Sequence, residues 1–112
     1  ICDKETNQMI GSIKFEKLDE IKGEAELGYF LRKDFWGKGL MTEAVKELVY
    51  LSFEKFQLKE LKIVTHVENA GSQKVALKAG FRLFRQFKGS DRYTRKMRDY
   101  YDFRLGRGDF YE

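Results

Sequence analysis

Two glycines, Gly37 and Gly39, interrupt the stretch 35–44, FWGKGLMTEA, between a predicted strand and a predicted helix. The first N–H groups of a helix have no intrahelical partner and carry partial positive charge, so a phosphate placed there gains hydrogen bonds and a favourable field. Glycine permits a positive φ and lets a ligand approach the backbone closely. The stretch therefore predicts an anion-binding loop, with an ordinary strand-to-helix turn as the alternative.

A second group able to do chemistry is a carboxylate on the strand that precedes this loop. Side chains alternate between the two faces of a strand. One face of residues 24–31 holds Ala25, Leu27, Tyr29 and Leu31, and the other holds Glu24, Glu26, Gly28 and Phe30. Glu26 therefore lies among small and aromatic neighbours, where a carboxylate can act on a reacting group.

These residues must be positioned by the surrounding elements. Residues 9–18 alternate in polarity and predict a strand, which the polar turn 19–23 joins to 24–31 as an antiparallel hairpin. Residues 42–56 carry an apolar stripe at helical spacing, and the β-branched run 61–67 is typical of a buried parallel strand. We therefore expect strands 24–31 and 61–67 to lie parallel, joined by a right-handed crossover.

The second half of the chain alternates helix and strand again. The predicted elements are a helix over 72–79 that ends at Gly80, a strand over 81–87, a polar loop over 88–95, a strand over 96–105 antiparallel to its predecessor, and a tail over 106–112 without regular structure. The predicted fold class is thus α/β, with a mixed sheet that is antiparallel at both ends.

Composition sets broad limits. At 112 residues the chain is one domain, and its 22 Lys and Arg against 18 Asp and Glu give a net charge of +4, which suits an anionic ligand and does not require nucleic acid. A single cysteine, Cys2, cannot form an internal disulfide, so we expect a cytoplasmic location. The sequence has no apolar run of transmembrane length, so no membrane partner is expected.

A further motif joins the loop to a known family. Asn69 and Ser72 precede the second predicted helix, which ends in KAGF at Phe81. A Gly-x-Gly loop followed by NxxS and KxGF resembles the GNAT N-acetyltransferases, in particular the RimJ/RimL-type branch that acetylates protein N-termini and related amines. The resemblance spans roughly residues 10–104. It implies the GNAT acyl-CoA N-acyltransferase fold, a mixed sheet with helices on both faces, in a chain whose first strand and helices are missing.

The resemblance also implies the co-substrate, acetyl-CoA, and the residues that bind it. The family's loop, Q/R-x-x-G-x-G/A, is DFWGKG here, so Asp34 occupies the position of the usual Gln or Arg, and Arg32, Lys33 and Lys38 are expected to supply the charge. Trp36 is expected to pack beneath the loop. The full expected set for acetyl-CoA is Phe30, Leu31, Arg32, Trp36, Gly37, Lys38, Gly39, Leu40, Met41, Thr42, Asn69 and Ser72.

Acetylation of an amine needs a proton acceptor and a donor for the oxyanion. The resemblance assigns the first role to Glu26, acting through water, with Glu24 as the second candidate and a solvated edge residue as the alternative interpretation. It assigns the second to a backbone N–H of Phe30 or Leu31, where the family's strand diverges from its parallel neighbour.

The departing thiolate needs a third group. Many relatives use a tyrosine at the position of Ala76 here, and the RimJ/RimL pattern points instead to Ser72, whose alternative role is a helix N-cap. Asn69 is expected to bind backbone or the cofactor. The lone histidine, His66, is expected to be a core residue, and no metal site is expected.

Acetyl-CoA and an amine acceptor are thus the expected partners, in a monomer or homodimer. Two other functions remain open. A CoA-binding sensor or scaffold without catalysis is favoured by Asp34 and Ala76. Nucleic-acid binding is less favoured, because Asp91 and Asp99 interrupt a basic segment that also carries aromatic residues. Its basic residues are Arg82, Arg85, Lys88, Arg92, Arg95, Lys96 and Arg98.

Overall fold

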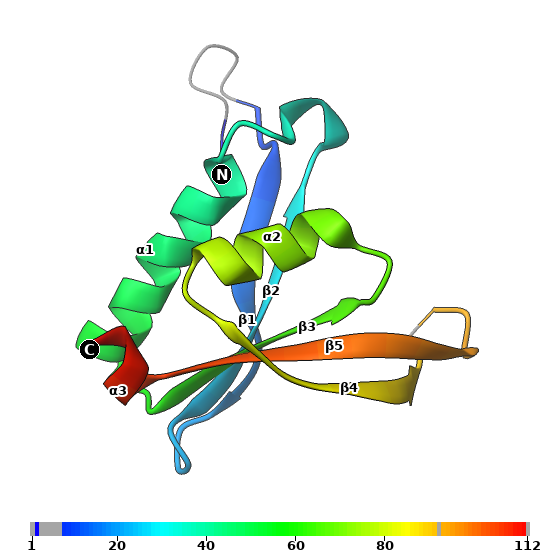
Figure 1. The fold of residues 1–112 in the computed structure, drawn as a ribbon. Coiled ribbons are helices and arrows are strands. Elements are labelled where there is room, and N and C mark those ends of the chain that lie inside the picture. Colours follow the sequence, from blue (N-terminus) through cyan, green and yellow to red (C-terminus); the bar gives the residue numbers. More distant parts are fainter. Residues whose placement is uncertain (1, 3–7, 92, 112) are drawn as a thin grey trace.

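The structure, a computed structural model, describes residues 2, 8–91 and 93–111 and contains a five-stranded mixed sheet of order β1-β2-β3-β5-β4 (Figure 1). The elements in chain order are β1 (Gly11–Asp19), β2 (Glu24–Leu31), a 3-10 turn η1 (Lys33–Phe35), α1 (Leu40–Glu54), β3 (Glu60–His66), α2 (Ala70–Lys78), β4 (Arg82–Ser90), β5 (Met97–Gly106) and α3 (Arg107–Phe110).

Strand pairing confirms the predicted mixed sheet. β1 and β2 form an antiparallel hairpin with an irregularity between Phe15 and Lys17, and β5 pairs antiparallel with both β3 and β4. β2 and β3 are parallel, and α1 connects them. The alternation of β2 and β3 fixes this register, because a shift by one residue would exchange the buried and exposed faces.

The core lies between the sheet and both long helices. α1 contributes Met41, Val45, Val49 and Phe53, α2 contributes Ala76, and the sheet contributes Ala25, Leu27, Leu61, Ile63, Phe103 and Leu105. Each large apolar side chain that is fully buried stabilises the fold by about 1.5–3 kcal/mol. Since the residues of α1 and α2 join one cluster, both helices pack on the same face of the sheet (Figure 1).

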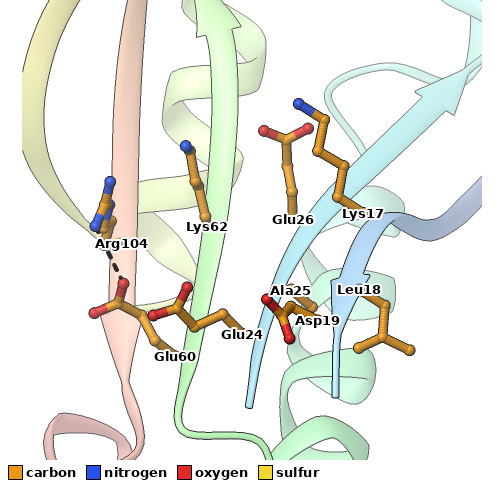
Figure 2. A pocket seen from close by; sticks show the side chains of 9 residues that line it. All are labelled: Lys17, Leu18, Asp19, Glu24, Ala25, Glu26, Glu60, Lys62 and Arg104. Atoms are coloured by element: carbon orange, nitrogen blue, oxygen red, sulfur yellow. Dashed lines mark hydrogen bonds and ion pairs between the residues drawn. The ribbon is translucent and has the colours of Figure 1, made fainter. Parts of the chain in front are cut away.

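The opposite face carries polar side chains of β2, β3 and β5, including Glu26, Lys62 and Arg104 (Figure 2). Among the described residues, no helix of the core cluster covers it. Both helices of the core cluster therefore lie on one face of the sheet. Within the same part of the chain, no helix has the length and apolar content required to cross a membrane.

Several predicted boundaries need correction. α2 begins at Ala70 rather than at residue 72, and β4 continues to Ser90, into the segment predicted to be a loop. α1 begins at Leu40 rather than at residue 42, because Gly39 adopts a left-handed conformation (φ 75°) and caps the helix directly. The tail predicted to be irregular contains α3, whose Phe110 ring lies 5.1 Å from the ring of Phe53. Tyr111 also bonds Glu54, so contacts with α1, which local sequence does not reveal, order this segment up to residue 111.

Candidate active site

The glycine loop has the backbone conformation that the sequence predicted. Gly37 and Gly39 have φ values of 78° and 75°, in the left-handed region that favours glycine. A Cβ built on either residue would meet nothing within 4 Å, so the space beside both is open. Glu43 N donates to Gly39 O at 3.0 Å, which begins the helical bonding of α1. The preceding N–H groups therefore form the end of a helix facing an open, glycine-lined surface.

The N–H groups at this helix end belong to Leu40, Met41 and Thr42, which form the first turn of α1. Met41 is 5% exposed, so its side chain anchors the turn in the core. These residues offer backbone donors to a ligand, and the side chain of Met41 is committed to packing.

Charge around the loop differs from expectation. Arg32 Nη2 lies 3.1 Å from Asp34 Oδ2, so this guanidinium is paired within the loop. Lys38 Nζ lies 5.2 Å from the centre of the Phe35 ring. Within the described residues, Lys33 and Lys38 form no ion pair and are the loop's unpaired cations.

Trp36 does not pack beneath the loop, contrary to prediction. It is 61% exposed, and its Nε1 donates to Leu31 O at 2.7 Å. Indole N–H groups seek an acceptor while the ring supplies apolar surface. Trp36 therefore fastens the loop to the end of β2.

β2 separates from β3 part-way along its length. The parallel pairs run from Glu24↔Glu60 to Leu27↔Ile63, whereas β1 pairs with β2 as far as Leu31. The end of β2, from Gly28 to Leu31, thus has a sheet neighbour on one side only. We call the space between this end of β2 and the end of β3 the strand gap. It provides the divergence expected near Phe30 and Leu31.

Tyr29 joins Ser72 to β2. From the sequence, Tyr29 was predicted only to lie on one face of its strand. Tyr29 Oη lies 2.7 Å from Ser72 Oγ and donates to Ser72 O at 3.0 Å. Burial raises the pKa of Tyr29, and the bond to Ser72 lowers it in part. No sequence signal linked residues so far apart in the chain.

The N-cap of α2 is Asn69, not Ser72. Asn69 Oδ1 accepts from Ser72 N at 3.0 Å, which is the standard bond of a capping side chain. The hydroxyl of Ser72 is therefore not used for capping.

Glu26 faces the open side of the sheet beside a shallow cavity of about 240 Å³. Figure 2 shows its side chain extending from β2 on the same side as Lys17 and Lys62, while Glu24 lies near Glu60 at the strand ends. Glu26 is half-buried and Glu24 is exposed. Glu26 also lies near the end of the segment that pairs with β3, one residue before the last pair, Leu27↔Ile63.

A buried carboxylate organises the cations near this cavity. Asp102 is 0% exposed and bonds Arg104 Nη2 at 3.0 Å and Arg85 Nε at 3.1 Å, with Lys62 Nζ at 3.9 Å. The bond to Asp102 is the main cause of the raised pKa of Arg104. A buried charge requires such partners, so Asp102 fixes the surrounding cations.

His66 differs from the expected core residue. Its side chain is 34% exposed, its ring stacks on Tyr100 at 4.7 Å, and Nε2 lies 3.4 Å from Asp91 Oδ2. Nδ1 is buried without a partner among the described residues. Across that same part of the chain, no three His, Cys, Asp or Glu side chains gather as a possible metal site.

The sequence of residues 1–82 matches the family model of the acetyltransferase (GNAT) domain. The chain belongs to the GNAT family. The predicted α/β fold with a mixed sheet is thus confirmed as that of a GNAT domain.

Relatives of this GNAT chain include ribosomal-protein acetyltransferases. It is 31% identical over 75 residues to the ribosomal-protein-serine acetyltransferase of Escherichia coli, covering 67% of this chain and 42% of that protein. It is 36% identical over 73 residues to a putative ribosomal N-acetyltransferase of Bacillus subtilis, covering 65% and 40%. An uncharacterized N-acetyltransferase of Bacillus licheniformis, p20, is 31% identical over 105 residues, or 94% of this chain and 59% of that protein. The chain spans less than two thirds of the length of each.

Solved structures show the same fold. A putative ribosomal-protein-serine acetyltransferase from Vibrio cholerae has a TM-score of 0.83 at 25% identity, over 94% of this chain and 60% of that one. The ribosomal-protein-S5-alanine acetyltransferase from Vibrio fischeri has a TM-score of 0.88 at 22% identity, over 96% and 60%. The second likeness concerns the fold alone.

Ala76 occupies the position at which the resemblance to the family implied a tyrosine in many relatives. Its side chain is 0% exposed and packs in the core. Any hydroxyl acting on a leaving group must therefore come from another residue.

The basic segment considered for nucleic-acid binding is partly neutralised, because Arg85 pairs with Asp102 and Arg98 pairs with Glu68. Arg92 lies outside the described residues.

Proposed function

We propose that this GNAT domain belongs to an acetyl-CoA-dependent N-acetyltransferase that acts on a primary amine, either a protein N-terminus or a small amine, by direct attack in a ternary complex. The observation that carries the proposal is the open, left-handed glycine loop at the N-terminus of α1, next to the strand gap. The names of the ribosomal-protein relatives favour a protein as the acceptor.

The loop residues fit a pyrophosphate. The N–H groups of the turn around Gly37 and Gly39 and the start of α1 would hold the phosphates, supported by Lys33 and Lys38. Phe30 and Leu31 lie along the gap that would receive the remaining arm of the molecule. When bound, acetyl-CoA supplies an acetyl group activated as a thioester.

Glu26 would act on the amine. An N-terminal amine has an ordinary pKa of about 8 and a lysine-type amine one of about 10.4, so most of either amine is protonated near neutral pH. Glu26, half-buried and two residues before the gap, would take this proton through a water molecule. Glu24 is exposed and farther from the gap, which makes it the second candidate.

Two groups would stabilise charge as the amine attacks. The backbone N–H of Leu31 would bond the developing oxyanion, since it points to the side on which β3 does not pair with this end of β2. The N–H of Phe30 is the less suitable of the two expected donors. Arg32 N donates to Ile10 O, and alternate residues of an antiparallel strand face the same neighbour, so the N–H of Phe30 points toward β1. The Ser72 hydroxyl, left free of capping by Asn69, would bond the leaving sulfur.

The test uses the full-length protein, acetyl-CoA and a panel of amines that includes peptides beginning with Ser or Ala and a polyamine. Release of CoA is followed with a thiol reagent, and the acetylated product by mass spectrometry. Catalysis should require an acceptor and should be lost in Gly39→Asp. Acetyl-CoA binding without CoA release for any acceptor would instead support the sensor or scaffold alternative.

A further inference from the structure

The Tyr29 hydroxyl meets Ser72 at two atoms, and only one arrangement of protons is possible at a time. A carbonyl oxygen can only accept, so the 3.0 Å contact to Ser72 O uses the single phenol proton. In that state the 2.7 Å contact must be donated by the Ser72 hydroxyl. If the phenol proton turns to Ser72 Oγ, the serine proton becomes available to another acceptor.

The start of α2 is fastened to both strands that border the strand gap. Tyr29 connects it to the end of β2 that does not pair with β3, and Gln73 Nε2 donates to Val67 O, directly after β3, at 2.7 Å. Asn69 fixes the backbone N–H of Ser72. Ser72 is therefore held at the gap from both sides.

We propose that Tyr29 is a positioning residue that turns the Ser72 hydroxyl toward the sulfur of CoA, a role that rests on the proposed function. Tyr29 donates to Ser72 Oγ, and Ser72 donates its own proton as a hydrogen bond to sulfur. The nitrogen–carbon bond forms, the carbon–sulfur bond breaks, and its electron pair remains on sulfur. Solvent later protonates the thiolate, whose ordinary pKa is about 8.5 for a cysteine-like thiol.

This arrangement suits a domain in which the expected tyrosine of α2 is replaced by Ala76. Hydrogen bonds in a chain strengthen one another, so a serine that accepts from a phenol is a better donor to a thiolate. Tyr29 thus provides from β2 a hydroxyl that α2 lacks.

The decisive experiment measures binding rather than turnover. Wild-type protein, Tyr29→Phe and Ser72→Ala are titrated calorimetrically with CoA and with desulfo-CoA, which lacks the sulfur, at pH 7 and pH 9. Tyr111→Phe is the matched control, since it removes a phenol that bonds Glu54 on α1. If Tyr29→Phe fails to fold, a Ser72→Ala variant that keeps the wild-type thiolate preference still overturns the proposal.

In the wild type and the control, the preference for CoA over desulfo-CoA should rise about tenfold between pH 7 and pH 9, as the thiolate forms. Tyr29→Phe and Ser72→Ala should each abolish that rise. In a steady-state assay of acetylation, Tyr29→Phe should lower kcat about tenfold. The double variant that carries Tyr29→Phe and Ser72→Ala should have the same kcat as Ser72→Ala alone.

Two failures are distinguishable. Wild-type protein that binds neither CoA nor acetyl-CoA would overturn the proposed function together with this inference. Wild-type protein that binds CoA and acetylates amines, alongside a Tyr29→Phe variant with the same thiolate preference, would overturn only the role of Tyr29. A variant that loses thermal stability but keeps that preference and kcat would reduce Tyr29 to a structural brace, which also overturns it.

Discussion

Asp34 and Arg32 form an ion pair beside the glycine loop, with 3.1 Å between Oδ2 and Nη2. The acid at the first position of the loop motif therefore neutralises a neighbouring cation that would otherwise face an anionic ligand. The pair is exposed, so its own contribution to stability is small. Its main consequence is the charge presented to the ligand.

We expect Asp34→Gln to tighten acetyl-CoA binding about threefold at low salt, as estimated for one charge at roughly 6 Å in a water-like dielectric. The gain should shrink as ionic strength rises. Calorimetric Kd values at two salt concentrations check this. Asp19→Asn, at the far end of β1, should leave Kd unchanged. Unchanged or weaker binding by Asp34→Gln at low salt would contradict the prediction.

Gly37→Asp and Gly39→Asp should each weaken acetyl-CoA binding at least tenfold. A Cβ at either position meets no protein atom within 4 Å, so the loss would come from backbone strain at positive φ and from a carboxylate facing the phosphates. Gly80→Ala is the control, since Gly80 has φ 97° at the end of α2. It should cost about 1 kcal/mol of stability without changing Kd. Wild-type affinity in both Asp variants would remove the loop from the site.

Glu26→Gln should leave acetyl-CoA affinity unchanged and lower kcat by roughly 10² to 10⁴ near neutral pH. Part of this loss should be recovered as pH rises, because free amine accumulates without help. Ser72→Ala should not recover, since it affects the leaving thiolate. The measurement is kcat from pH 6 to pH 10, with Glu24→Gln as the matched variant. An undiminished kcat in Glu26→Gln would transfer the role to Glu24 or another group.

Asp91 should contribute stability that depends on pH. The backbone N–H groups of Thr94 and Tyr93 hold its pKa below the ordinary value, at hydrogen-bond distances of 3.0 and 2.9 Å. A depressed folded-state pKa means that the stabilisation is present above the unfolded value of about 4 and is lost as pH falls through the folded one. Thermal unfolding should therefore show Asp91→Asn destabilised at pH 7, with the difference shrinking as pH falls below about 4. A difference that did not shrink as pH falls below that value would count against this titration.

Much of the fold followed from local patterns. Period-two alternation marked β2 with its observed bounds, and the apolar stripe of α1 identified the face that packs on the sheet. These signals succeed because burial of one face dictates both the pattern and the structure. The glycine loop could likewise be predicted from local sequence, because a positive φ restricts the residue type.

The features that could not be predicted depend on contacts or backbone geometry that local sequence does not reveal. The four residues of α3 carry too little local signal, and they are ordered by contacts of Phe110 and Tyr111 with α1. Ser72 and Asn69 both suit helix caps, and only the backbone geometry selected Asn69. The bond between Tyr29 and Ser72 joins residues 43 positions apart, which neither periodicity nor composition could reveal.

Because β2 pairs with β3 over only part of its length, backbone amide protons in the two parts of β2 should exchange with solvent at different rates. From Glu24 to Leu27 the strand has neighbours on both sides, and from Gly28 to Leu31 it has β1 alone. Amide protons of the second segment that point toward the gap have no strand to accept them, so deuterium should enter there far sooner than in the first segment. Exchange of the amides on the β3 side of this strand should therefore become abruptly faster beyond Leu27, and a molecule bound in the gap should be detected as slowed exchange confined to that end.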